Sequence, residues 1–335
     1  MDEILLTTII PVYNTGQYLL RCLQSVVGQH MQPGDTEVLV VDDGSTDDSR
    51  SVVEAFAREH PQVKLLVQDN AGVSAARNLA LNHARGRYIM FVDSDDYLCD
   101  DSVPALLQRV LDEDLDVLSF NYCYKDVHGN DLPHTRDDNY ASTTVTTGVD
   151  FLNGHSMTPY VWRFIIRRDF LNEGKLRFDP SLIVCEDGAL ISRFMLNAGR
   201  MAHENKTAYC YVKRADSAMH NTDRDHLRRR IYSQVDSAAL INAAARQYES
   251  ATGNAAPASV DGVRNVYLYF SMTKALTSGL VDEVLQRIRN AGLFPFPCVG
   301  PEADYHGKKW IVIHRLMMHP RLWSLLSKVY RMIKK

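Results

Sequence analysis

The strongest constraint on the fold of this chain is a regular alternation of strand-like and helix-like segments in its first hundred residues. Short apolar runs rich in β-branched residues predict strands, and amphipathic spacing between them predicts helices. Four such alternations predict an α/β fold with a mostly parallel, doubly wound sheet. The expected strands are 4–12, 37–41, 63–67 and 87–92, and the expected helices are 18–29, 46–60 and 74–84.

The pattern changes after residue 96, where strands become fewer and a helical region follows. We expect four segments, 1–98, 99–222, 223–304 and 305–335. The second has a polar, Thr-rich stretch at 126–147, which predicts a mobile loop. Other expected strands are 117–124, 161–166 and 208–212, and the expected helices are 103–111, 187–196, 224–248, 259–277 and 281–290.

Polar, turn-forming clusters follow three of the first four predicted strands. They are Tyr13-Asn14, Asp42-Asp43-Gly44-Ser45 and Asp93-Ser94-Asp95-Asp96. Carboxyl ends of parallel strands share one edge of a sheet, where open α/β folds bind ligands. Capping of a strand end explains any one cluster, but the two acidic clusters together favour a binding crevice. Asp42 is expected only to cap or brace its loop.

The run Asp93-Ser94-Asp95-Asp96 predicts a metal–diphosphate site. Clustered carboxylates repel one another and raise one another's pKa values. A hard cation with oxygen ligands relieves that repulsion, and Mg²⁺ is usually shared with substrate phosphates. The chain has neither G-x-G-x-x-G nor G-x-x-x-x-G-K-[ST], so a metal and side chains must meet the diphosphate charge.

Composition narrows the class of protein. The chain has 335 residues, 45% apolar and 23% charged, with a net charge of −4, which argues against general nucleic-acid binding. Six cysteines without C-x-x-C spacing are interpreted as reduced core thiols. The acidic start is unlike a signal peptide, and no apolar stretch approaches the ~20 residues of a membrane span. A cytoplasmic protein is expected.

Four motifs stand in order in the first hundred residues: Ile9-Ile10-Pro11-Val12-Tyr13-Asn14, Val41-Asp42-Asp43-Gly44-Ser45-Thr46-Asp47, Asn70-Ala71-Gly72-Val73-Ser74-Ala75-Ala76-Arg77-Asn78 and Phe91-Val92-Asp93-Ser94-Asp95-Asp96. Together they resemble the family 2 glycosyltransferases of GT-A fold. A weaker resemblance continues through Val161-Trp162-Arg163 and Cys185-Glu186-Asp187-Gly188 to Tyr209-Cys210-Tyr211-Val212.

The resemblance implies a nucleotide-sugar site built from these motifs. Asp43 would accept a hydrogen bond from the base, usually uracil. Asn70 and Arg77 would complete the base and ribose side of the pocket; Arg77 could also be a structural salt-bridge partner of Asp43, and both roles can hold. Asp93 would contact ribose or metal-bound water, and Asp95 would ligate Mn²⁺ or Mg²⁺. The nucleotide-sugar residues implied are Pro11, Tyr13, Asp43, Asn70, Arg77, Asp93, Ser94 and Asp95.

The resemblance also implies inversion by direct displacement, which needs a base for the acceptor hydroxyl. The acidic pair Glu186-Asp187 before a predicted helix resembles the family's pattern, with Asp187 as the preferred base. Helix capping is the alternative, since carboxylates are favoured at helix amino termini.

Further candidates each have a structural alternative. Trp162 could stack on an acceptor sugar or be a core tryptophan, and His220 could complete the metal shell or be structural. Lys213 and Arg214 could contact phosphate or form a solvated turn.

The last segment has one apolar helical face, Leu322, Leu325, Leu326, Val329 and Ile333, and a basic opposite side. This pattern suits an anionic membrane surface, so peripheral attachment to the inner face of the cell membrane is expected. Packing on the protein itself or on a second copy, as in a homodimer, is the alternative.

We therefore expect a metal-dependent inverting glycosyltransferase of bacterial surface-polysaccharide synthesis. It would transfer a sugar from a UDP-sugar to a hydroxyl of a glycan or lipid-linked glycan. Two alternatives are transfer onto a polyol-phosphate polymer and a sugar-nucleotide-binding subunit without turnover.

Overall fold

The computed structural model describes residues 4–32, 34–136, 138–214 and 224–294, and five residues near the carboxyl end, His319, Leu322, Trp323, Leu325 and Leu326. The chain forms two compact units. Unit 1 comprises Met1–Phe151, Tyr160–Pro180 and Asn197–Ser217, and unit 2 comprises Leu152–Pro159, Ser181–Leu196 and Ala218–Lys335. The segment limits expected from the sequence stay a prediction.

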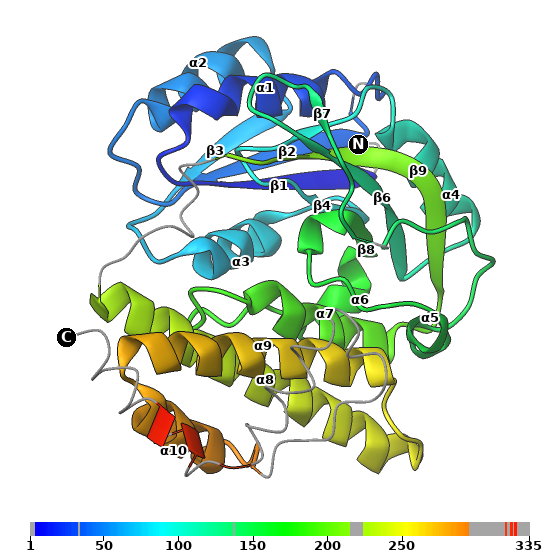
Figure 1. Cartoon of the computed structure of the whole chain (residues 1–335). Helices are drawn as coiled ribbons and strands as arrows, with labels where there is room; N and C mark the ends of the chain where they lie inside the picture. Colours follow the sequence, from blue (N-terminus) through cyan, green and yellow to red (C-terminus); the bar gives the residue numbers. More distant parts are fainter. Residues whose placement is uncertain are drawn as a thin grey trace. The chain divides into compact units, whose positions relative to one another are not determined.

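The first half of unit 1 is a parallel sheet in the order β3-β2-β1-β4. The helices α1 and α2 lie on one face of this sheet and α3 on the other (Figure 1). This confirms the doubly wound arrangement expected from the alternation. The elements are β1 (Leu6–Val12), α1 (Gly16–Val27), β2 (Thr36–Asp42), α2 (Ser49–Glu59), β3 (Val63–Val67), α3 (Val73–His83) and β4 (Tyr88–Phe91).

The second half of unit 1 extends the same sheet with strands of mixed direction. Next to β4, the strand β8 runs antiparallel, followed by β6 and β9, which are parallel to each other, and by the antiparallel edge strand β5. The elements are β5 (Tyr97–Leu98), α4 (Val103–Asp112), β6 (Val117–Lys125), β7 (Asp131–Leu132), α5 (Gly148–Gly154), β8 (Phe164–Arg167), α6 (Arg168–Glu173) and β9 (Met201–Val212).

Two strand predictions differ from the structure. The segment expected as a strand from 161 begins with a 3-10 helix, η1 (Val161–Arg163), and the strand follows as β8. β9 begins at Met201, well before the predicted start at 208. Its polar residues 203–207 hide the strand from a local pattern, because their pairing with β6 is long-range and carries register shifts.

Trp162 packs inside unit 1. Its ring stacks on Tyr160 at 5.0 Å and 7° and on Tyr209 at 4.2 Å and 9°. The side chain is 2% exposed. Trp162 is therefore a core residue, the alternative that the sequence left open, and it offers no ring face to an acceptor sugar in this structure.

The stretch 126–147, expected to be mobile, is anchored by a buried carboxylate. Asp138 is fully buried and accepts hydrogen bonds from Tyr122 Oη at 3.0 Å and His134 Nε2 at 3.0 Å. The guanidinium of Arg163, itself buried, lies 3.8 Å from Asp138 Oδ2. The polar composition of the stretch does not reveal this distant partner, and the expected mobility stays a prediction.

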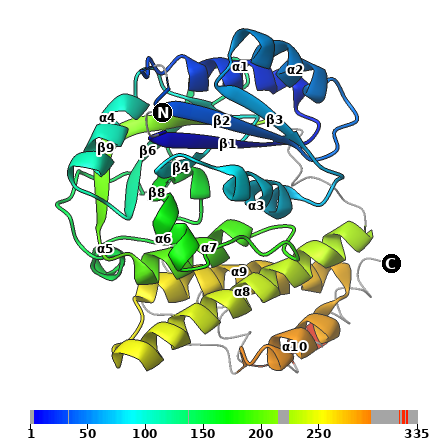
Figure 2. The same cartoon turned by 180° about the vertical axis from the view of Figure 1, so that it is seen from behind.

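Unit 2 is helical. Its elements are α7 (Glu186–Asn197), α8 (Arg224–Thr252), α9 (Ala258–Ser278) and α10 (Val281–Asn290). The long helices α8 and α9 run beside each other, as both views show (Figures 1 and 2). Ile231, Val235, Leu268 and Met272 are buried on them. None of the helices in the described part of the chain combines the length and the apolar character needed to cross a membrane.

The basic tail at 305–335 falls almost wholly outside the described residues. Of its described residues, Trp323 is 2% exposed and Leu325 is 56% exposed. The burial of Trp323 favours the alternative that this segment packs on the protein.

We predict that Asp138→Asn destabilises unit 1 by roughly 3 kcal/mol, because a buried guanidinium loses its counter-charge. Chemical denaturation followed by circular dichroism measures this loss. Asp131→Asn is the matched control, since Asp131 lies in the same stretch, pairs with Lys125 and is 84% exposed. Exposed pairs contribute little. Equal denaturation midpoints for the two variants would show that the buried pair does not hold this stretch.

Candidate nucleotide-sugar site

The turns after β1 and β2 are joined by hydrogen bonds. Asn14, whose φ is 53°, accepts from the backbone N–H of Thr46 through its Oδ1 at 2.8 Å, and its own N–H donates to Ser45 Oγ at 3.1 Å. Asp42 Oδ1 accepts from the backbone N–H of Ser45 at 3.0 Å. The bracing role expected for Asp42 is therefore confirmed.

Asp43 holds the loop that follows β3. Its Oδ1 accepts from Gln68 Nε2 at 2.7 Å and from the Ala71 N–H at 2.8 Å, and its Oδ2 accepts from the Gly72 N–H at 2.9 Å. Gly44 has a φ of 74°, and a Cβ there would lie 2.9 Å from the Asn70 backbone nitrogen. The β2 and β3 turns thus require glycine at 44 and an acceptor at 43.

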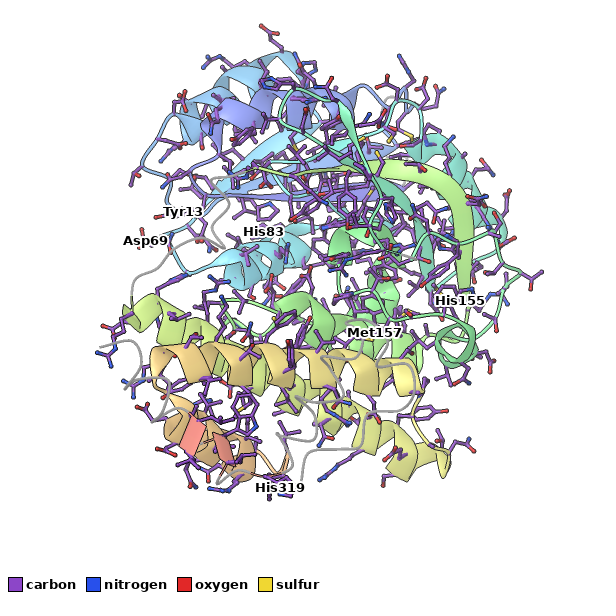
Figure 3. The ribbon with its side chains drawn as sticks, in the orientation of Figure 1. Tyr13, Asp69, His83, His155, Met157 and His319 are labelled. Carbon is purple, nitrogen blue, oxygen red and sulfur yellow. The ribbon has the colours of Figure 1, made fainter. Side chains whose placement is uncertain are left out.

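The acidic run after β4 meets the β1 turn in the same unit. Thr15 Oγ1 donates to Ser94 Oγ at 2.9 Å, and Cys22 Sγ on α1 lies 3.6 Å from the carbonyl oxygen of Asp93. Tyr13 and Asp69, which follow the ends of β1 and β3, are at this edge of the sheet and are exposed (Figure 3). The expected convergence of strand ends is therefore present in unit 1.

Two arginines neutralise the acidic run. Arg77 Nη2, on α3, lies 2.8 Å from Asp93 Oδ1, and Arg214 Nη2, after β9, lies 2.7 Å from Asp95 Oδ2. Arg77 and Arg214 are 4% and 13% exposed, whereas the two carboxylates are 28% and 25% exposed. The alternative partner expected for Arg77, Asp43, is wrong, because the guanidinium bonds to Asp93.

Burial and mutual repulsion disfavour negative charge in the run. Burial raises the pKa of Asp95, with the neighbouring Asp93 as the second cause. The pKa of Asp96 lies well above its usual range because the carboxyl is fully buried and close to Asp95 and Asp93. Asp96 accepts from Tyr209 Oη at 2.7 Å and from the Val212 N–H at 2.7 Å, so it fastens β9 to the run.

The sequence analysis missed two contacts of the acidic run and one contact of Arg214, which pairs with the run. Thr15 follows a recognised motif, so its nearness to Ser94 could have been suspected. Tyr209 belongs to a weaker motif, but its bonds to the run depend on the pairing of β9 with β5. The guanidinium carbon of Arg214 lies 4.9 Å from the centroid of the Tyr18 ring, and nothing in the sequence indicates that contact.

The acidic pair Glu186-Asp187 begins α7 in unit 2, and both side chains are half-buried. The residues before it are fixed by α8. Ser233 Oγ donates to the Val184 carbonyl oxygen at 2.9 Å, and Ser237 Oγ donates to the Cys185 carbonyl oxygen at 2.7 Å. Cys185 has a φ of 67°, an uncommon conformation for a side chain larger than glycine.

The start of α7 also packs closely on α9. A Cβ added to Gly188 would lie 2.3 Å from Tyr267 Oη, so only glycine fits there without movement of the tyrosine. His220 lies within 215–223, outside the described residues, so its expected metal role has no structural account.

The comparisons with known proteins identify the class. Residues 7–197, more than half of the chain, match the family described as "Glycosyl transferase family 2". The chain therefore belongs to glycosyltransferase family 2.

Individual relatives agree with this class. The chain is 33% identical over 230 residues to "Uncharacterized glycosyltransferase YibD" of Escherichia coli K12, covering 67% of this chain and 64% of YibD. It is 31% identical over 232 residues to "Glycosyltransferase GlyG" of Streptococcus pneumoniae, covering 64% of this chain and 73% of GlyG. The match thus spans less than two thirds of YibD.

A solved structure supports the fold. The crystal structure titled S. aureus TarS 1-349 in complex with UDP-GlcNAc has a TM-score of 0.67 and 21% identity, covering 98% of this chain and 92% of that one. At this identity the likeness concerns the fold, which is the GT-A type with a helical carboxyl-terminal region.

We predict that Asp43→Ala lowers the free energy of unfolding by about 2 kcal/mol, because hydrogen bonds to a charged acceptor contribute about 1.5–3 kcal/mol each. Asp69→Ala is the control, since Asp69 is an exposed carboxylate of the loop after β3, the loop that Asp43 holds. Thermal and chemical denaturation of both variants measure the difference. A loss for Asp69→Ala as large as that for Asp43→Ala would contradict the assigned bracing.

Proposed function

We propose that this protein is an inverting glycosyltransferase that uses a UDP-sugar and a divalent cation. The observation that carries the proposal is the acidic run Asp93–Asp96, packed against the β1 turn at the binding edge of the parallel sheet. The acceptor in this proposal is a hydroxyl of a glycan or lipid-linked glycan of a surface polysaccharide.

The residues of the run suit a hard cation. Burial and the neighbouring Asp93 raise the pKa of Asp95 even though Arg214 pairs with it, so a bound divalent cation would further favour the charged form of this carboxylate. Mn²⁺ or Mg²⁺ prefers carboxylate and phosphate oxygens, and Asp95 with Asp93 would supply the protein's share. When bound, the cation neutralises the diphosphate of the donor and so stabilises the departing nucleoside diphosphate.

The nucleoside side of the donor would lie on the β1 and β3 turns. Tyr13 is 49% exposed, so its ring is available to stack on a base, which Tyr13 and Pro11 would flank. Asp43 Oδ2 accepts one hydrogen bond in the structure, and a carboxylate oxygen has two acceptor sites, so a base N–H could be a further donor. The exposed Asn70 would contact the base or ribose.

Charge in the site would be redistributed when the donor binds. Arg77 pairs with Asp93, and that pair would face the ribose with Ser94 next to it. Arg214 pairs with Asp95, and we assign its guanidinium to the donor diphosphate. When the donor binds, the diphosphate would replace Asp95 as the partner of Arg214, and the bound Mn²⁺ or Mg²⁺ would neutralise Asp95 instead.

The base for the acceptor hydroxyl would be Asp187, with Glu186 beside it. Both occupy the first turn of α7, held by Ser233, Ser237 and the contact of Gly188 with Tyr267. A base must sit within hydrogen-bond reach of the proton it removes, and a fixed helix start provides a firm position. The catalytic role in this proposal rests on the family motif.

Named relatives support the donor class. Structures of TarS carry titles with UDP and with UDP-GlcNAc, and a mannosyltransferase from Pyrobaculum calidifontis, with a TM-score of 0.53, is titled as a complex with GDP-Man and Mn²⁺. The two TarS complexes favour a uridine nucleotide here, and the mannosyltransferase complex supports a divalent metal in this fold.

A second acceptor is favoured by one relative. The chain is 28% identical over 211 residues to a protein named "Poly(ribitol-phosphate) beta-N-acetylglucosaminyltransferase TarS" of Staphylococcus aureus. Transfer onto a polyol-phosphate polymer uses the same donor site and base. Parallel assays with a neutral oligosaccharide and with poly(ribitol phosphate) would decide between the two acceptors.

We predict that Asp95→Asn abolishes metal-dependent binding of UDP. In the unaltered protein, UDP with Mn²⁺ should raise the melting temperature more than UDP alone, because a ligand that binds only the folded state stabilises it. In Asp95→Asn the increment due to Mn²⁺ should disappear, while Asp69→Asn keeps it. A metal increment unchanged in Asp95→Asn would remove this residue from the cation site.

We predict a different defect for Asp187→Asn. Loss of a general base lowers turnover by about 10²–10⁴-fold, and donor binding should stay normal because the base contacts the acceptor. Turnover is measured as UDP release with acceptor present, and binding by the melting-temperature increment with UDP and Mn²⁺. The control Asp282→Asn changes a first-turn carboxylate of α10 in the same unit. Turnover of Asp187→Asn within tenfold of the unaltered protein would exclude this base.

A further inference from the structure

Three cysteines gather on one side of the sheet in unit 1. Cys99 Sγ lies 3.3 Å from Cys210 Sγ, and Cys123 Sγ lies 3.5 Å from Cys210 Sγ. All three sulfur atoms lie within 4.8 Å of one another. Each is a free thiol, with Cys210 buried and the other two partly exposed. We call Cys99, Cys123 and Cys210 the thiol cluster.

The sheet itself brings these residues together. Cys123 on β6 and Cys210 on β9 are register partners in a parallel pair, so their side chains point to the same face. Cys210 also faces Tyr97 on β5, and Cys99 follows two residues later, with its N–H bonded to the Ala208 carbonyl oxygen at 2.9 Å. Strand pairing therefore places Cys123 and Cys210, and the backbone hydrogen bond to β9 places Cys99, which lies directly after β5.

The three thiols of the cluster change one another's pKa values. Contacts with Cys210 and Cys99 lower the pKa of Cys123, and the contact with Cys123 raises the pKa of Cys210 and of Cys99. Lys125 Nζ, two residues along β6, adds a nearby positive charge, although Asp131 accepts from it at 2.7 Å.

We propose that the thiol cluster binds one thiophilic cation of the Zn²⁺ class through its three sulfur atoms. A Zn–S bond of about 2.3 Å places tetrahedral sulfur ligands roughly 3.8 Å apart. The observed separations need only small shifts of the side chains to reach that value. Three metal–sulfur bonds form, the thiol protons pass to water, and water from the partly exposed side takes the fourth position.

This site differs in kind from the one proposed at Asp93 and Asp95. Thiolates favour soft or borderline metals, whereas carboxylates and phosphates favour Mg²⁺ and Mn²⁺, so the two sites would sort cations by softness. The thiol cluster would tie β5, β6 and β9 together. Tyr209, next to Cys210, bonds to Asp96, so the cross-link would stiffen the strand that supports the acidic run.

The test uses Co²⁺ as a spectroscopic probe, with the whole, fully reduced chain, no polyhistidine tag and excess Mg²⁺ to fill carboxylate sites. Co²⁺ bound by thiolates gives an intense sulfur-to-metal charge-transfer absorption, which carboxylate sites lack. We expect this band in the unaltered protein, saturation at one equivalent, and its loss on addition of Zn²⁺. Calorimetry with Zn²⁺ alone should give the same stoichiometry.

Variants assign the ligands. Cys123→Ser and Cys210→Ser should each lose the band while their circular dichroism matches the unaltered protein. Cys185→Ser, which removes a partly exposed thiol of unit 2, should keep it. Asp95→Asn should also keep it, which separates this site from the proposed donor site, so that failure of either proposal leaves the other standing.

Three results would overturn the proposal. One is the absence of a thiolate–cobalt band in the reduced, unaltered protein. Another is a band that survives both Cys123→Ser and Cys210→Ser. The third is a disulfide within the cluster that persists in millimolar reductant, shown by thiol counting with two fewer reactive groups, because such a bond would consume two of the ligands.

Discussion

The site depends on the partners of three carboxylates crowded at the end of one strand. Asp93, Asp95 and Asp96 each have a different partner, and the partners come from distant parts of unit 1. Arg77 is supplied by α3, Arg214 follows β9, and the buried Asp96 relies on Tyr209 and the Val212 N–H. Because unpaired buried charge is costly, the acidic run holds both halves of the sheet to one arrangement.

Local pattern was enough for the parallel half of the sheet. β1 to β4 and the helices between them lie within a few residues of their predicted bounds, because each buried strand is a short apolar run closed by turn residues. The second half was harder to predict. The polar part of β9 pairs with β6 through register shifts, and Asp138 is buried against Arg163, neither of which a window of neighbouring residues contains.

The same distinction applies to the site. Residue types and strand ends indicated the carboxylates, and Asp42 braces its turn as expected. Partner choice could not be predicted: Arg77 bonds to Asp93, and Trp162 stacks between Tyr160 and Tyr209 in the core. Cysteines that seemed scattered in the sequence meet because β5 and β6 both pair with β9. The spacing of these cysteines along the chain does not indicate that they lie together in the fold.

The helical region had no assigned purpose in the sequence, and the structure gives it one. Residues 183–188, which lead into the acidic pair, are held by Ser233 and Ser237 of α8 and by the fit of Gly188 against Tyr267 of α9. Cys185 keeps a left-handed backbone there, and such strain persists only where surrounding contacts fix it. The helices α8 and α9 therefore have a structural role within unit 2 itself. Their buried faces already support the first turn of α7, where the proposed base lies.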